Sequence, residues 1–234
     1  MITSPIKTRI FREGDDLLSF ISSYLKKLPE KSILIITSKI VALSEKRTVA
    51  NYSQAIKEKL IKSESSLAIP TKKVWLTITD GLLMPSAGID ESNANGKLIL
   101  LPKNSFATAE RIRQKLCARF GITQLGIIIS DSRTLPLRAG VAGVALGYAG
   151  FRGLKDYRGT PDIFGRKFEY STTNCADSLA TAAVLVMGEG REQQPLAVIK
   201  NSTVEFCNSV NPNELLINPE DDMYRPLFST LTKL

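Results

Sequence analysis

Two short runs of aliphatic residues constrain the fold of this chain more than any other feature of its sequence. Ile33–Ile36 and the centre of segment 124–130 are continuously apolar, without the polar alternation of a strand that has one face in water. Runs of this length fit β-strands that are covered on both faces. We therefore expect a sheet with helices packed on both of its sides.

The length of the chain and the order of its segments narrow the fold class. With 234 residues, of which 43% are hydrophobic, the chain can bury a large core. Helical and strand-like segments alternate, but without the regular rhythm of a doubly wound sheet. We predict an α+β fold of irregular α/β type, with mixed sheets and flanking helices, in which residues 1–234 form one domain of two lobes.

Periodicity and capping signals assign most segments to helices or strands. The amphipathic helix over 105–120 is the clearest, with Ser105 as the expected N-cap and Gly121 just beyond its end. The strands at 74–79 and 97–101 are expected to pair as a hairpin around a long loop. Further helices are expected over 14–28, 51–64 and 174–187, and further strands over 5–12, from residue 32, and over 124–130, 166–172 and 196–200.

The sequence contains no histidine, which excludes several kinds of site. Histidine triads, histidine-ligated zinc and a histidine general base are all ruled out. Cys117, Cys175 and Cys207 are far apart and form no CxxC motif, so we expect reduced cysteines. No leader-like segment opens the chain and no apolar run reaches membrane-spanning length, so we expect a cytoplasmic protein.

A segment rich in oxygen ligands, residues 79–96, lies between two apolar runs and is expected to be a loop. It contains Asp80, Asp90, Glu91, Ser92, Asn93 and Asn95 among Gly81, Pro85, Gly88 and Gly96, which disfavour regular structure. A second acidic position, Asp131-Ser132, is expected where the 124–130 strand ends. Carboxylates and hydroxyls suit magnesium or manganese, which bridge phosphate oxygens. We therefore hypothesise that Asp90 and Asp131 meet and hold a metal–nucleotide complex.

Other segments are candidates for phosphate contacts or close packing. Ser38 and Lys39 directly follow the first buried strand, where ligands often bind in such sheets; the alternative is a strand exit with a solvated Lys39. The loop over 188–195 is also flexible and polar. The chain has no GxxxxGK[ST] sequence, so it has no P-loop. The glycines of 139–150 do not match GxGxxG, and we interpret them as small residues at a tight interface.

Seven short motifs stand in one order along the chain. They are Thr37-Ser-Lys-Ile-Val41, Pro85-Ser-Ala-Gly-Ile-Asp-Glu-Ser-Asn93, Leu101-Pro102, Ala109-Glu-Arg-Ile-Arg113, Ile128-Ile-Ser-Asp-Ser132, Gly159-Thr-Pro-Asp-Ile-Phe-Gly165 and Val186-Met-Gly188. Together they resemble the family of coenzyme F(420)-0:gamma-glutamyl ligases over roughly residues 5–200. The Ala-Gly-Ile-Asp-Glu-Ser-Asn motif is specific, and it coincides with the Asp131 motif.

The resemblance implies a family-specific fold and a defined reaction. GTP activates a substrate carboxylate as an acyl phosphate, and the amine of L-glutamate attacks it to form a gamma-linked amide. Magnesium or manganese is needed, potassium is a candidate additional cation, and the molecule is an intertwined homodimer.

The resemblance also implies roles for individual residues. Asp90 and Asp131 would be catalytic and would hold one metal ion, and Ser132 would contact a second ion. Asn93 would contact the nucleotide. The residues beside the nucleotide would be Ser38, Lys39, the edge from Pro5 to Thr8, and the loop from Gly188 to Gln194.

The chain departs from the family pattern at three places. Leu43 stands where the family commonly has a lysine, so that nucleotide contact would pass to Lys46 or Lys39. Asp131-Ser-Arg-Thr134 replaces Asp-Thr-x-Gly, and Asp177-Ser178 replaces Asp-Glu. These changes fit a paralogue with another acceptor, so the acceptor stays open between the deazaflavin precursor and a folate-like molecule.

Two other interpretations follow from the residues alone. The net charge of +8 favours anionic partners and would suit a nucleic-acid-binding protein without catalysis. That class does not explain Asp90 and Asp131, which would repel phosphate without a metal. A family member that binds ligand without turnover is the third interpretation, and the retention of Asp90, Asn93 and Asp131 argues against it.

Overall fold

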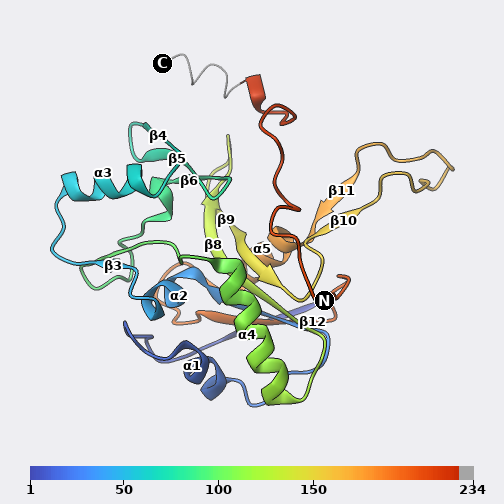
Figure 1. Ribbon diagram of the computed structural model, residues 1–234, viewed down its shortest axis with the longest axis horizontal. Helices are drawn as coiled ribbons and strands as arrows, with labels where there is room; N and C mark the ends of the chain where they lie inside the picture. The colour runs from blue at the N-terminus through green and yellow to red at the C-terminus, as the bar shows by residue number, and fades with distance from the viewer. Residues whose placement is uncertain (227–234) are drawn as a thin grey trace.

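A five-stranded mixed sheet forms the centre of the computed structural model, which describes residues 1–226 (Figure 1). Its strand order is β1-β12-β2-β8-β9, and the pair β2–β8 is parallel while the other pairs are antiparallel. The strands are β1 (Ile2–Ile6), β2 (Ser32–Thr37), β8 (Leu125–Thr134), β9 (Val141–Ala149) and β12 (Leu196–Lys200). The expected α+β class with mixed sheets and flanking helices is confirmed. The interpretation as one domain of two lobes stays a prediction.

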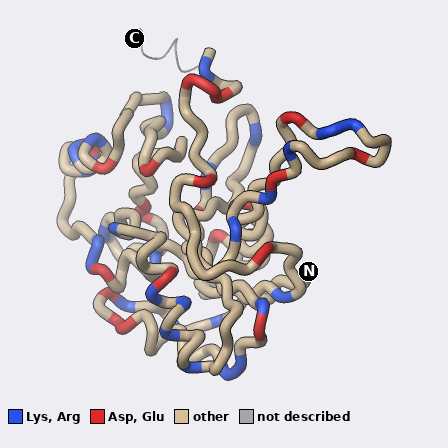
Figure 2. The backbone as a smooth tube through the Cα atoms, turned by 45° about the vertical axis from the view of Figure 1, so that its right-hand side comes forward, with Lys and Arg blue, Asp and Glu red and all other residues tan. Residues whose placement is uncertain are grey.

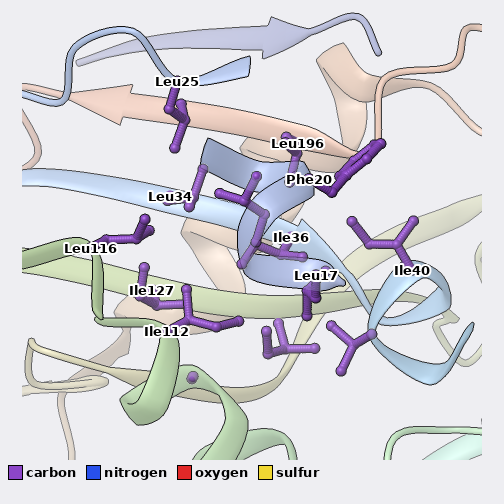
Figure 3. Close-up of a cluster of buried hydrophobic side chains, with 14 of the residues drawn as sticks. Leu17, Phe20, Leu25, Leu34, Ile36, Ile40, Ile112, Leu116, Ile127 and Leu196 are labelled. Carbon is purple, nitrogen blue, oxygen red and sulfur yellow. The ribbon is translucent and has the colours of Figure 1, made fainter. Parts of the chain in front are cut away.

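Helices cover both faces of this sheet, as the two apolar runs predict. Helices α1 (Leu17–Tyr24) and α4 (Ser105–Phe120) pack on one face, and α5 (Cys175–Met187) packs on the other. Leu34 and Ile36 of β2 point into the first core, whereas Ile33 and Ile35 point into the second. Figure 3 shows the first core, where Leu34, Ile36 and Ile127 of the sheet meet residues of α1 and α4.

Small sheets flank the central one. A three-stranded antiparallel sheet contains β4 (Leu67–Pro70), β5 (Trp75–Thr79) and β6 (Leu82–Pro85), and α3 (Gln54–Ser63) lies beside it (Figure 1). Two-stranded sheets pair β3 (Thr48–Val49) with β7 (Leu98–Ile99) and β10 (Leu154–Asp156) with β11 (Thr172–Asn174). The short α2 (Ser38–Ser44) follows β2 directly, and the 3-10 turn η1 (Ser86–Gly88) follows β6.

The expected hairpin between 74–79 and 97–101 is wrong. β5 pairs with β6, a strand inside the segment that was expected to be a loop. Asp80 and Gly81 have φ values of 51° and 78°, which make a two-residue turn that matches the strand twist. Pro85 is tolerated because it is the last residue of β6. The strand at 97–101 is shorter than expected, and its residues Leu98 and Ile99 pair with β3 instead.

Several element boundaries also differ from the predictions. The strand expected over 5–12 lies at Ile2–Ile6, where Pro5 is allowed because β1 is an edge strand. The strand expected over 166–172 begins only at Thr172. β8 does not end at Asp131 but continues to Thr134, because β9 pairs with it beyond a bulge after Ile129. The helices expected over 14–28 and 51–64 are shorter, as α1 and α3.

The glycine-rich segment 139–150 forms most of β9 and lies against two helices. A Cβ atom on Gly143 would lie 2.4 Å from the Ala180 carbonyl oxygen of α5. A Cβ atom on Gly147 would lie 2.5 Å from the Phe106 nitrogen of α4. Both helices therefore approach the backbone of β9 closely, which confirms the interpretation of these glycines as packing residues.

Candidate functional site

Two neighbouring parallel strands deliver polar residues to the same edge of the central sheet. Thr37 of β2 pairs in register with Ser130 of β8. Because the strands run in the same direction, the residues that follow them, Ser38 and Asp131, leave the sheet side by side. The Ser38 hydroxyl hydrogen-bonds to the Asp131 carboxylate. This edge lies outside the carboxyl ends of parallel strands, where ligands bind in sheets of this kind.

Asp90 reaches this edge from a distant part of the sequence. Its backbone forms an antiparallel bridge with Ile99 of β7, with two hydrogen bonds of 2.9 Å. Its carboxylate accepts hydrogen bonds from the backbone nitrogen and the hydroxyl of Ser92, at 2.7 and 2.8 Å. Lys39 Nζ lies 2.7 Å from Asp90 Oδ2 and also donates to the Ser92 carbonyl at 2.7 Å. Lys39 is therefore part of the site and not a solvated residue at a strand exit.

The two aspartates have opposite pKa shifts. Burial opposes ionisation of Asp90, but Lys39 and the Ser92 donors outweigh it and hold the pKa of Asp90 below its usual value. Burial raises the pKa of Asp131 to about 6, and repulsion from Asp90 adds to that effect against donors at Ser132, Lys39 and Ser38. The two carboxylates are thus close enough to influence each other, as the sequence analysis expects.

The loop over 188–195 closes over the same edge. Ser132 Oγ donates to Glu189 Oε1 at 2.5 Å, and Asn93 Nδ2 donates to the Gly190 carbonyl at 3.1 Å. The loop thereby connects the Asp90 segment with the Asp131 segment. Gly188, at its start, has a φ of 80° and ends α5.

The end of this loop is fixed to the first two strands. The Gln193 carbonyl accepts a hydrogen bond of 2.9 Å from the Thr8 nitrogen, and the Pro195 carbonyl accepts one of 3.0 Å from the Thr37 nitrogen. Gln194 lies between these two anchored residues. The structure thus brings the predicted edge around Thr8 and the predicted loop to one place.

Glu189 is a site residue that the sequence analysis did not single out. Its carboxylate faces Ser132, which is two residues beyond the end of the β2–β8 pairing. The available signal was an acidic residue between Gly188 and Gly190, directly after a helix. Such a position gives a carboxylate to a flexible loop, but only the fold shows which side chain it meets.

The donor atoms fit a hard divalent cation that arrives with a nucleotide. Residues 1–226 contain no cluster of three or more His, Cys, Asp or Glu side chains that could hold a metal ion by itself. Magnesium, however, is usually held by one or two carboxylates together with substrate phosphates and water. The Asp131 carboxylate accepts one backbone hydrogen bond, from Ser132 at 2.8 Å, and one from the Ser38 hydroxyl, which leaves acceptor capacity free.

Two departures from the family pattern lie away from this cluster. Lys46 has a φ of 55°, and its Cε atom lies near Gly14, so Lys39 is the lysine at the site. Asp177 accepts hydrogen bonds from Arg133 at 3.0 Å and from the Ala145 nitrogen at 2.9 Å. Asp177 therefore joins α5 to the β8–β9 pair, which is a structural contribution.

Comparison with known proteins agrees with this geometry. A family model described as F420-0:Gamma-glutamyl ligase matches residues 5–201. The chain belongs to this family. Membership in the gamma-glutamyl ligase family makes it an enzyme, a ligase that forms a gamma-glutamyl amide bond. Among the described residues, no helix is long and apolar enough to cross a membrane.

Individual relatives cover most of the chain. A protein of Methanococcus maripaludis strain C7 named Coenzyme F420:L-glutamate ligase is 31% identical, over 96% of this chain and 100% of that protein. A protein of the same name from Methanopyrus kandleri is 28% identical, over 94% of this chain and 95% of its own length. One from Haloarcula marismortui is 38% identical, over 62% of this chain and 56% of its own length.

Proposed function

We propose that this protein joins L-glutamate to a carboxylate acceptor through a gamma-linked amide, with GTP and a divalent metal ion, magnesium or manganese. The acceptor is coenzyme F(420)-0 or a folate-like molecule. The names of the relatives support the first acceptor, and the departures at Leu43 and Ser132 support the second.

The convergence of four distant segments carries this proposal. Asp90, Asp131, Lys39 and the loop with Glu189 meet at one sheet edge through printed contacts of 2.5 to 3.1 Å. Acidic residues gathered around one lysine suit a metal–triphosphate complex, because the metal offsets the repulsion between carboxylates and phosphates.

The reaction divides into two balanced steps. An oxygen of the acceptor carboxylate bonds to the γ-phosphorus of GTP, GDP leaves, and an acyl phosphate results. The amine of L-glutamate then bonds to the acyl carbon, inorganic phosphate leaves, and the amine loses a proton. A divalent cation held by Asp90 and Asp131 would neutralise charge on the transferred phosphoryl group.

The residues of this chain have separate tasks in that scheme. Lys39 and Ser92 hold the Asp90 carboxylate in one orientation before substrates bind. Asn93 and the loop over 188–195 lie where the nucleotide would be enclosed, and Ser132 with Glu189 forms a second polar pair beside it. Since the chain has no histidine, the proton of the amine passes to a carboxylate, water or phosphate.

A homodimer and a potassium ion complete the proposal. The arm between β10 and β11 extends away from the rest of the chain (Figure 1) and exposes Ile163, Phe164 and Tyr170 by 91%, 89% and 86%. Exposed apolar side chains of this size support contact with a second copy. Potassium rests on the family resemblance alone.

Nucleic-acid binding without catalysis is the weaker alternative. The net charge of +8 supports it, but Figure 2 shows basic and acidic residues interspersed along the chain. A continuous basic stripe is the electrostatic footprint of nucleic-acid binding.

Phosphate release tests the proposal. The protein is incubated with GTP, magnesium or manganese, L-glutamate and, separately, coenzyme F(420)-0 or tetrahydrofolate. We expect release that depends on one acceptor and on the metal. Absence of metal-dependent GTP binding would contradict the proposal at its first step.

A further inference from the structure

A groove separates the first turns of α3 from the turn that joins β4 to β5, on the small sheet labelled in Figure 1. Its volume is about 330 Å³, within the range of small-molecule sites. Gln54, Lys57, Ile61, Lys73, Trp75 and Ser86 are among the residues that line it. None of the residues assigned to the site above lines this groove.

The lining offers a flat apolar surface together with a free positive charge. Trp75 is half-buried, and Ile61 and Val74 continue the apolar lining. The Lys62 ammonium lies 5.1 Å from the centre of the indole ring, which adds positive charge nearby. Lys73 is exposed and forms no ion pair with any residue of the described part of the chain. These features suit a planar aromatic molecule that carries an anionic group.

The groove is connected to the Asp90 segment in two ways. Ser86 lines the groove and Asp90 lies four residues further on, so their Cα atoms are at most about 14 Å apart. Lys57 also lines the groove, and its ammonium lies 2.7 Å from Glu91 Oε2, on the residue next to Asp90. Lys57 and the Tyr52 hydroxyl hold the pKa of Glu91 below its usual value, so this connection is an ion pair at neutral pH.

We propose that this groove is the subsite for the aromatic part of the acceptor. An aromatic anion seated against Trp75 and Lys73 would be close enough to extend a carboxylate toward Asp90. The inference rests on the proposed function, because it assigns the groove to the acceptor of that reaction. L-glutamate has no ring to place against the indole, and the candidate nucleotide contacts are on the other side of the Asp90 segment, at Lys39 and Asn93.

Tryptophan fluorescence tests this assignment directly, because Trp75 is the only tryptophan of the chain. Coenzyme F(420)-0, tetrahydrofolate and GTP are titrated separately into the protein without L-glutamate. We expect saturable quenching by at least one of the two acceptors and none by GTP. Lys73→Glu is expected to raise the Kd of that acceptor by on the order of tenfold. Lys72→Glu is the matched control: it makes the same charge change on the adjacent exposed residue outside the groove, and less than about a twofold effect is expected.

The outcomes separate the groove from the reaction. Quenching by GTP alone, or equal Kd values for the two lysine variants, would overturn the assignment. Acceptor-dependent phosphate release with a KM that Lys73→Glu leaves unchanged would also overturn it, while supporting the proposed function. Saturable quenching that Lys73→Glu weakens, without any phosphate release, supports the groove and contradicts only the proposed reaction.

Discussion

Asp90 and Asp131 show how two identical side chains acquire different properties from their surroundings. Lys39 and Ser92 stabilise the charged form of Asp90, whereas burial and the charge of Asp90 disfavour the charged form of Asp131. A pKa of about 6 leaves Asp131 mostly ionised at neutral pH, but at a cost in folding free energy. Additional positive charge beside Asp131 would relieve that cost.

The two aspartates therefore predict stability changes of opposite sign. The folded pKa of Asp131 is raised, so its penalty is fully present above pH 6 and fades as the pH falls through 6 toward 4. Asp131→Asn should raise the free energy of unfolding of the metal-free protein by roughly 1–2 kcal/mol at pH 7.5, after allowance for partial exposure, and by little at pH 4. Urea denaturation at the two pH values measures this.

Asp90→Asn is the matched control for that measurement. The folded pKa of Asp90 is lowered, so its stabilisation is present above the usual pKa and is lost as the pH falls. The variant should lose roughly 1 kcal/mol at pH 7.5. Losses of similar size in both variants at pH 7.5 would show that Asp131 is not under electrostatic strain.

Glu189 is expected to support metal binding through Ser132. Glu189→Gln removes the charge that faces the Ser132 hydroxyl, and it should weaken manganese binding in the presence of GTP by about tenfold. Isothermal titration measures the affinity. Glu169→Gln, on the arm between β10 and β11, makes the same change at an exposed position and should have no effect. Equal affinities for the two variants would remove Glu189 from the site.

At the scale of single elements, the sequence predicted the parts whose signals are local. The continuous apolar runs predicted β2 and β8, and helical periodicity predicted α4 and α5. β6 was missed because Pro85 and the glycines were given more weight than the Asp80-Gly81 turn, a common hairpin signal. Pairing partners such as β3 with β7 depend on long-range packing, which no local pattern contains.

The cap of α4 is an element boundary that the structure corrects. Asn104, not Ser105, is the N-cap, and its side chain accepts a hydrogen bond from the Ala107 nitrogen at 2.9 Å. Asn104→Ala should lower the free energy of unfolding by about 1 kcal/mol. Ser105→Ala should change it by less than about 0.5 kcal/mol, because Ser105 is already inside the helix. Thermal or urea unfolding of both variants distinguishes the two caps, and the reverse order would contradict the structure.

The close contact between β9 and α5 predicts a strong effect of one methyl group. Gly143→Ala would place Cβ against the Ala180 carbonyl, a backbone atom that has little freedom to move. We expect a loss of about 2 kcal/mol in urea denaturation. Val141→Ala, at the half-exposed start of the same strand, should cost less than about 1 kcal/mol. A tolerated Gly143→Ala would mean that α5 lies further from the sheet.

At the scale of the whole molecule, the site exists only because four distant segments meet. Lys39, Asp90, Asp131 and Glu189 are separated by 150 residues in the sequence, yet they gather at one sheet edge. Oxygen-rich composition suggested Asp90 and Asp131, and the family resemblance added Ser38, Lys39 and Asn93. Glu189 and the groove beside Trp75 depend on packing between segments, so only the fold reveals them.

The chemical identity of the product tests the central claim most directly. The protein, GTP, L-glutamate and magnesium or manganese are incubated with coenzyme F(420)-0 or tetrahydrofolate, and the acceptor is recovered and weighed by mass spectrometry. The account predicts an acceptor heavier by one or more glutamyl residues, formed only when metal and GTP are present and absent with Asp131→Asn. Phosphate released while both acceptors keep their original mass would contradict it.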